Sequence, residues 1–166
     1  MKENEIIQKM LLTNNRMALS SAGGIPTLLR APSYQSPTDL DIALIGVPFD
    51  GGTTNRAGAR HGPREIRNQS NMLGFQNHYN KITPYTLCRI GDVGDVPLCH
   101  QHNLEKSIQE IEAYYHTITK ANAIPITAGG DHSISYPILK ALGAQQPLAL
   151  IHIDAHCDTA LENGCN

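Results

Sequence analysis

Four apolar runs constrain the fold of this chain more than any other feature. They cover residues 41–48, 86–96, 123–130 and 148–156, and each has the length and composition of a strand. Helical patterns separate them at residues 63–73, 103–121 and 133–143. Strands that alternate with helices are typical of right-handed crossovers in a parallel sheet. The sequence therefore predicts an α/β fold built on a mostly parallel sheet.

The ends of the predicted helices carry recognisable signals. Asn103 is a candidate N-cap for the second helix, in which apolar residues recur at intervals of three and four. Pro63 suits the first turn of the helix that it opens, and Gly143 suits a helix C-terminus. Residues 1–40 contain several breakers, so we expect an N-terminal arm there and the main domain at residues 41–166.

Composition and charge exclude several classes of function. The chain has 166 residues, a net charge of −2 and a pI near 6.4. This balance gives no electrostatic basis for binding nucleic acid or an anionic membrane. No apolar run approaches the roughly 18 residues of a membrane span, and the N-terminus lacks the apolar core of a secretory signal. We therefore expect a cytoplasmic protein with reduced cysteines.

Polar side chains follow the third and fourth runs, where the strands are expected to end. The sequence "GGDHS" covers residues 129–133, and Asp154, His156 and Asp158 follow the fourth run. Ligands of open parallel sheets bind beyond the carboxyl ends of the strands. If the backbone stays extended, side chains at every second position point the same way. Asp154, His156 and Asp158 would then converge, and His132 could join them from a neighbouring strand.

This group of oxygen and nitrogen ligands predicts a metal site. Carboxylates favour Mn²⁺ or Mg²⁺, and imidazole also admits Zn²⁺ or Fe²⁺. Burying an uncompensated carboxylate costs on the order of several kcal/mol, and a bound cation would offset this cost. The simpler alternative is that these residues cap or decorate a loop. His152 shares a strand face with Asp154, and we expect it to support the site from outside the ligand set.

Three sequence motifs in order resemble the ureohydrolases, the arginase and agmatinase family. They are "GVPFDGGTTNRAGARHGPREIR", "GGDHS" and "IDAHCDT", and they extend over roughly residues 40–159. The first motif is more similar to the agmatinase-like branch, which includes guanidinobutyrase and guanidinopropionase. The resemblance implies a three-layer α/β fold, a binuclear manganese site, and hydrolysis of a guanidino group to urea and an amine. Agmatine and the guanidino acids are the expected substrates, and polyamine metabolism is the expected context.

The resemblance also implies a role for each site residue. His132 matches a ligand of one manganese, Asp154 a bridging ligand, and His156 a ligand of the other manganese. Asp158 matches a further ligand of the first manganese, and it is a candidate proton carrier in catalysis. Asp131 would support the site without binding metal. A homo-oligomer is expected if the full domain is present.

The chain departs from the family pattern after residue 159. The motif S-x-D-x-D-x-x-D-P, which supplies two more aspartate ligands, is absent from the sequence. We therefore expect an apparently truncated ureohydrolase that is inactive alone. One alternative is a remnant that acts as a metal-binding or interaction module. Another is a zinc deacetylase of related fold, which the "AGARHGPREIR" segment and the complete D-x-H-x-D pattern disfavour.

The glycine-rich segment after the first run has a separate interpretation. It lacks the G-K-[ST] ending of a phosphate-binding loop, so its glycines are expected to permit tight turns and close packing. Its arginines are expected in salt bridges or subunit contacts rather than in catalysis, and they are Arg56, Arg60, Arg64 and Arg67.

Overall fold

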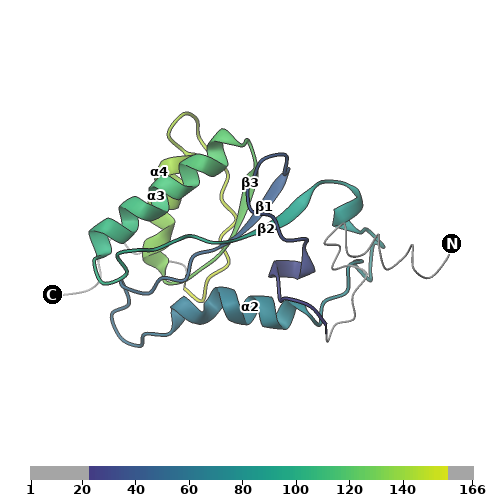
Figure 1. Cartoon of the computed structure of the whole chain (residues 1–166), viewed down its shortest axis with the longest axis horizontal. Coiled ribbons are helices and arrows are strands. Elements are labelled where there is room, and N and C mark those ends of the chain that lie inside the picture. The colour runs from purple at the N-terminus through teal and green to yellow at the C-terminus, as the bar shows by residue number, and fades with distance from the viewer. Residues whose placement is uncertain (1–22, 157–166) are drawn as a thin grey trace.

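A three-stranded parallel sheet lies at the centre of the computed structural model, which describes residues 23–156. The strands are β1 (Ile42–Gly46), β2 (Ile90–Asp95) and β3 (Ile124–Ala128), in the spatial order β2-β1-β3. The helices are α2 (Gly62–Ser70), α3 (Leu104–Lys120) and α4 (Ser135–Leu142). Figure 1 shows α3 and α4 on one side of the sheet and α2 on the other. The predicted three-layer α/β fold is confirmed.

Short 3-10 helices occupy several of the connections. They are η2 (Leu28–Arg30), η3 (Ala59–His61), η4 (Pro84–Thr86) and η5 (His132–Ile134). η5 is the start of the helix predicted at residues 133–143, and it leads directly into α4. Within the predicted arm, η2 buries Leu28 against β1 and β2 in a small second core. The domain boundary at residue 40 stays a prediction.

The central strand β1 holds the two layers of helices together. Ala43, Leu44 and Ile45 are fully buried, because β1 is paired with a strand on each side and covered on both faces. Alternate side chains point to opposite faces. Ile45 accordingly joins the main core under α3 and α4, whereas Leu44 joins the second core with Leu28.

The predicted helix ends of α3 and α4 are confirmed by hydrogen bonds. The Asn103 side chain accepts a hydrogen bond from the Lys106 N–H at 3.0 Å, as an N-cap does. The Gly143 N–H donates to the Leu139 carbonyl at 2.8 Å and closes the last turn of α4. The apolar face of α3 then packs on the sheet.

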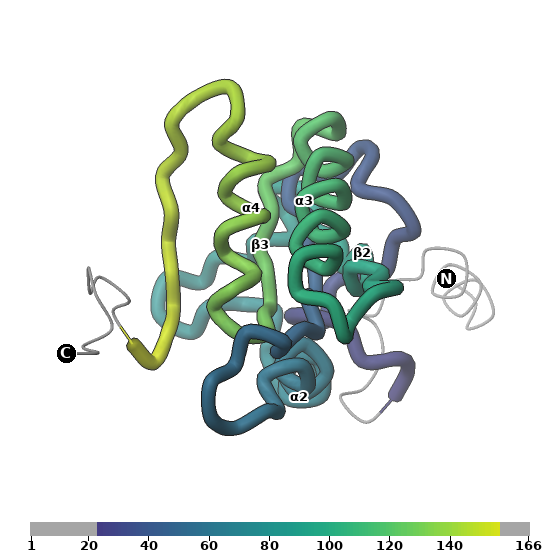
Figure 2. The backbone as a smooth tube through the Cα atoms, turned by 90° about the vertical axis from the view of Figure 1, so that its left-hand side faces the viewer, coloured from purple at the N-terminus to yellow at the C-terminus, as the bar shows by residue number. Residues whose placement is uncertain are grey.

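The prediction of a fourth strand at residues 148–156 is wrong. The structure has no strand there, and the segment runs extended at the outside of the molecule beyond α4 (Figure 2). Its side chains are open to solvent, with Ile151 91% and Ile153 95% exposed. The apolar pattern satisfies the local requirement of a strand, but a strand also needs a neighbour for its backbone hydrogen bonds. Among the described residues, this segment pairs with no strand, although one side of β3 is unpaired.

Within residues 23–156, the outer side of β3 is an open sheet edge. The Ile124 N–H donates to the Asp41 carbonyl, and the Ala128 carbonyl accepts from the Val47 N–H, both at 2.9 Å. The backbone groups of the even-numbered residues therefore face β1. Pro125, between them, faces the open edge, which is the position where a strand tolerates a residue without an N–H.

Candidate metal centre

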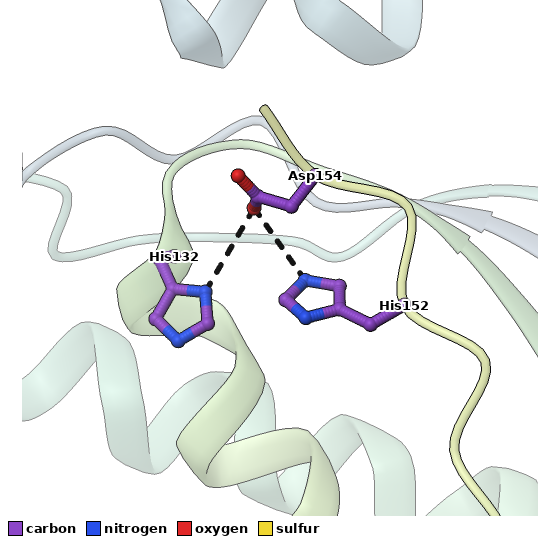
Figure 3. A group of neighbouring side chains, drawn as sticks. All are labelled: His132, His152 and Asp154. Carbon is purple, nitrogen blue, oxygen red and sulfur yellow. Dashed lines mark ion pairs between the residues drawn. The ribbon is translucent and has the colours of Figure 1, made fainter. Parts of the chain in front are cut away.

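Two imidazoles and a carboxylate converge beyond the carboxyl end of β3. His132 opens η5 directly after that strand, while His152 and Asp154 come from the extended segment. Asp154 Oδ2 lies 3.5 Å from His152 Nε2 and 3.9 Å from His132 Nδ1. One ligand atom from each of the three residues lies within 4.8 Å of the other two. Figure 3 shows both rings turned toward the same carboxylate.

The carboxylate of this group is ionised and accessible. The His156 backbone N–H, which donates to Asp154 Oδ1 at 2.9 Å, lowers the pKa of Asp154 most. Partial burial acts against this change, and the positive charges available on His152, His132 and His156 lower the pKa of Asp154 further. The side chains of His132, His152 and Asp154 are 51%, 38% and 27% exposed. The group therefore presents a negative oxygen between two imidazoles, and a small ion can reach it from solvent.

These three residues fit a divalent transition-metal ion. Two imidazole nitrogens and one carboxylate oxygen suit Mn²⁺, Fe²⁺ or Zn²⁺. Ligand atoms about 2.1 Å from an ion lie about 3.0–3.4 Å from each other at octahedral or tetrahedral angles. The separations of 3.5 and 3.9 Å would have to contract by roughly 0.1–0.9 Å to reach this range. An exposed group of three protein ligands also leaves coordination positions open, as catalytic sites do.

The other predicted ligands are placed differently. His156 has an 82% exposed side chain, and its Nδ1 lies 3.7 Å from Asp154 Oδ1, the oxygen that does not face His132 and His152. The structure thus brings His156 next to Asp154 but outside the group of three. Asp158 lies outside the described residues, so its roles as ligand and proton carrier stay predictions.

Asp131 joins the turn after β3 to the glycine-rich loop after β1. Its Oδ2 accepts the Gly52 N–H at 2.7 Å, and its Oδ1 accepts the Ser133 N–H at 3.0 Å and the Ser133 hydroxyl at 2.5 Å. Its own N–H donates to the Phe49 carbonyl at 2.8 Å. Asp131 therefore holds the segment that carries His132 against the loop, and a supporting role in the site stays its predicted function.

An ion pair inside the glycine-rich loop was not singled out by the sequence. The side chain of Asp50 is fully buried and forms an ion pair with Arg60, whose Nε donates to it at 2.6 Å. It also accepts the Gly58 N–H at 2.7 Å. The hydrogen bond from the Arg60 guanidinium is the main reason why the pKa of Asp50 falls to about 2. Sequence spacing alone does not pair residues ten positions apart in an irregular loop, because its turns are not periodic.

The arginines of this region divide into two groups. Arg60 and Arg67 form salt bridges, as expected, and Arg67 bridges Asp92 and Asp95 of β2. Arg56 and Arg64 are exposed. Arg67 links α2 to β2, so the helix that follows the loop is fixed to the sheet.

Comparisons with known proteins agree with this fold. The arginase family model matches residues 40–164. Guanidinopropionase from Pseudomonas aeruginosa is 49% identical over 136 residues, which are 82% of this chain and 42% of that protein. No helix of the described residues is long and apolar enough to cross a membrane.

Solved structures show the same relationship. The proclavaminate amidinohydrolase of Streptomyces clavuligerus superposes with a TM-score of 0.77 and 35% identity, over 84% of this chain and 48% of that one. A formiminoglutamase variant from Trypanosoma cruzi, solved with Mn²⁺, gives a TM-score of 0.57 and 32% identity, over 70% of this chain and 39% of that one. The chain thus spans less than half the length of these relatives. The match to the family model, together with these similarities, shows that the chain belongs to the arginase family.

Proposed function

We propose that this chain takes part in the metal-dependent hydrolysis of a guanidino compound to urea and an amine. The observation that carries the proposal is the convergence of His132, His152 and Asp154 beyond β3 in an arginase-family chain. In the reaction, one water is added to the guanidino carbon and the bond from this carbon to the substituted nitrogen breaks. The similarity to a guanidinopropionase favours a guanidino acid or agmatine as substrate.

We propose manganese as the ion, because carboxylate and imidazole ligands suit it and a related structure is titled with Mn²⁺. His132 and Asp154 would hold it, and His156 and Asp158 complete the predicted ligand set. When bound, a divalent cation polarises substrate oxygen or nitrogen and makes water acidic near neutral pH. Asp131 keeps His132 in place through its bonds to Gly52.

The expected partners follow from the same proposal. The substrate is a small guanidino compound, and neither nucleic acid nor a membrane is expected to bind. We also propose a cytoplasmic location and a homo-oligomer as the working assembly. Gel filtration with light scattering measures the mass in solution and tests the assembly directly.

Urea release tests the proposed activity. The chain alone is expected to be inactive, so the test uses a full-length version that also carries the two further aspartate ligands of the family pattern. This version is incubated with Mn²⁺ and 3-guanidinopropionate, 4-guanidinobutyrate, agmatine or arginine, with and without a chelator. We expect chelator-sensitive urea release with at least one of the first three compounds, and its loss in Asp154→Asn. Glu105→Gln, an exposed change in the first turn of α3, is the matched acidic control. No urea from any compound, or full activity of Asp154→Asn, would refute the proposal.

A second candidate function is a metal-binding or interaction module without catalysis. The observation that favours it is the exposed apolar segment that contains Leu148, Leu150, Ile151 and Ile153. Contiguous exposed apolar side chains mark surfaces that bind other proteins. Metal binding and stable association in the absence of any urea release would support this function.

A further inference from the structure

We propose that an apolar patch beside η2 binds the N-terminal segment of this same chain, at residues 6–18. The patch, called the η2 patch below, consists of four exposed apolar side chains, which are Ile25, Leu29, Met72 and Leu73. None of them belongs to the metal-ligand group, so the inference does not rest on the proposed function. Contiguous exposed apolar side chains mark surfaces that bind other groups.

Hydrogen bonds join the two parts of the chain that carry the patch. The Leu29 N–H donates to the hydroxyl of Ser70, the last residue of α2, at 3.0 Å. The Arg30 guanidinium donates to the Leu73 carbonyl at 3.1 Å and lies over the Phe75 ring, 4.2 Å from its centre. The two parts of the patch therefore meet where η2 lies against the C-terminal end of α2 (Figure 1).

The backbone of η2 is strained at the patch. Leu29 and Arg30 have φ angles of +52° and +58°, in the left-handed region that bulky residues rarely adopt. Leu28, one position earlier, is 4% exposed and packs in the second core, whereas Leu29 is 41% exposed. A turn that served only to redirect the chain would favour glycine or asparagine there. A large apolar side chain held at the surface in a strained turn instead points to a binding surface.

Residues 1–22 precede the patch and lie outside the described residues, and their sequence carries a matching pattern. Apolar residues recur there at intervals that put them on one face of an α-helix. They are Ile6, Ile7, Met10, Leu11, Met17 and Ala18. Charged residues fall on the opposite face, at Glu5, Lys9 and Arg16. A short helix of this kind is marginal alone in water, and packing on the η2 patch would stabilise it.

The covalent connection favours this segment over a second copy of the chain. The described part begins at residue 23, two positions before Ile25. Residues 12–22 can span roughly 15 Å as a helix and up to roughly 35 Å when extended, so the apolar face can reach the patch. A segment tethered at such a distance has an effective concentration on the order of millimolar. A separate copy would reach the same occupancy only at a comparable protein concentration.

Tryptophan fluorescence tests the docking, because the chain contains no tryptophan. Met72→Trp puts a single reporter in the patch, at a position that the described residues leave 78% exposed. Its emission should be blue-shifted and protected from quenching by acrylamide. Adding Ile7→Ser with Leu11→Ser should remove most of this protection. Gln8→Ser with Leu12→Ser is the matched control on the opposite face, and it should keep the protection.

Hydrogen exchange gives a second measurement that needs no reporter. The amides of Leu29 and Leu73 should exchange faster in the chain with Ile7→Ser and Leu11→Ser than in the unchanged chain. The amides of α3, which lies on the other side of the sheet, should keep their rates. Far-UV circular dichroism and thermal unfolding show that each variant is folded.

Three results would overturn the proposal. The first is equal quenching of the reporter with and without Ile7→Ser and Leu11→Ser, which would show that the segment does not cover the patch. The second is an equal loss of protection with Gln8→Ser and Leu12→Ser, which would show that no apolar face is recognised. The third is protection that grows with protein concentration together with a doubled mass in light scattering, which would assign the cover to a second copy. Protection that is independent of concentration and lost only with the apolar-face substitutions would support the proposal.

Discussion

The buried ion pair between Asp50 and Arg60 should stabilise the glycine-rich loop that Asp131 holds beside the metal centre. Asp50→Asn keeps the shape of the side chain and removes its charge. The fully buried carboxylate accepts hydrogen bonds from the Arg60 guanidinium, from the Gly58 N–H and, at 3.4 Å, from the Arg60 N–H. An amide has one acceptor oxygen, and its NH₂ group would face donors rather than acceptors.

The expected loss in the free energy of unfolding is about 1 kcal/mol. The fall in the pKa of Asp50 from 3.8 to about 2 corresponds to about 2 kcal/mol when the pair is shielded from water. We halve this figure because the Arg60 side chain is 42% exposed and solvent screens the pair. The backbone donors Gly58 and Arg60 are already included, because their hydrogen bonds contribute to the same fall in pKa.

Urea unfolding followed by circular dichroism measures this difference. Because folding lowers the pKa of Asp50, its contribution is complete above about pH 4 and disappears as the pH falls through about 2. The gap between the unchanged chain and Asp50→Asn should therefore be full at pH 7 and shrink toward pH 2. Asp41→Asn is the matched control, because Asp41 pairs with Arg89 at the surface and should change stability much less. Equal effects of the two substitutions, or a gap that does not depend on pH, would refute the reasoning.

Two further predictions concern packing and association. Gly130 has a φ of +55°, and a Cβ there would come within 2.6 Å of the Phe49 carbonyl oxygen. Gly130→Ala should therefore lower the free energy of unfolding by roughly 3 kcal/mol or more. Gly94→Ala, at a φ of +84° with nothing within 4 Å, should cost only about 1–2 kcal/mol; similar melting temperatures for the two variants would contradict this explanation. Ile151→Ser with Ile153→Ser should leave the melting temperature unchanged, because both side chains are more than 90% exposed, and should reduce self-association in sedimentation experiments. A lower melting temperature would show that this segment packs on the fold.

Much of the fold could be predicted from local sequence signals. The three strands that form lie inside the apolar runs at residues 41–48, 86–96 and 123–130, because each run combines an apolar stretch with a breaker. The Asn103 cap fixes the start of α3 through a contact within the same turn. The run at residues 148–156 has an equally good local pattern but pairs with no strand among the described residues. Pairing is a long-range property that a local pattern does not contain.

The candidate site, like the fold, could be predicted only in part from the sequence. Sequence reasoning predicted His132 beside Asp154, and the structure places His132 Nδ1 and Asp154 Oδ2 3.9 Å apart, although the run that carries Asp154 forms no strand. Sequence reasoning placed His156 on the face of Asp154 by assuming an extended backbone, and the hydrogen bond from the His156 N–H to Asp154 bends the chain at that point. His152, which lies before the bend, meets the carboxylate instead. The His156 ring thus lies on the Oδ1 side of Asp154, whereas His132 and His152 lie on the Oδ2 side.

The orientation of Pro125 limits the registers in which another strand could pair with the open side of β3. Within β3, the outward-facing backbone groups are the Pro125 carbonyl and the N–H and carbonyl of Thr127, because the even-numbered residues face β1. An incoming strand thus meets two acceptors but a single donor, and it must place its own acceptor opposite Thr127. A strand displaced by two residues would set that acceptor against the proline ring and leave it without a hydrogen bond. Pro125 therefore favours the register in which the acceptor of the incoming strand lies opposite Thr127. It also disfavours edge-to-edge association in other registers.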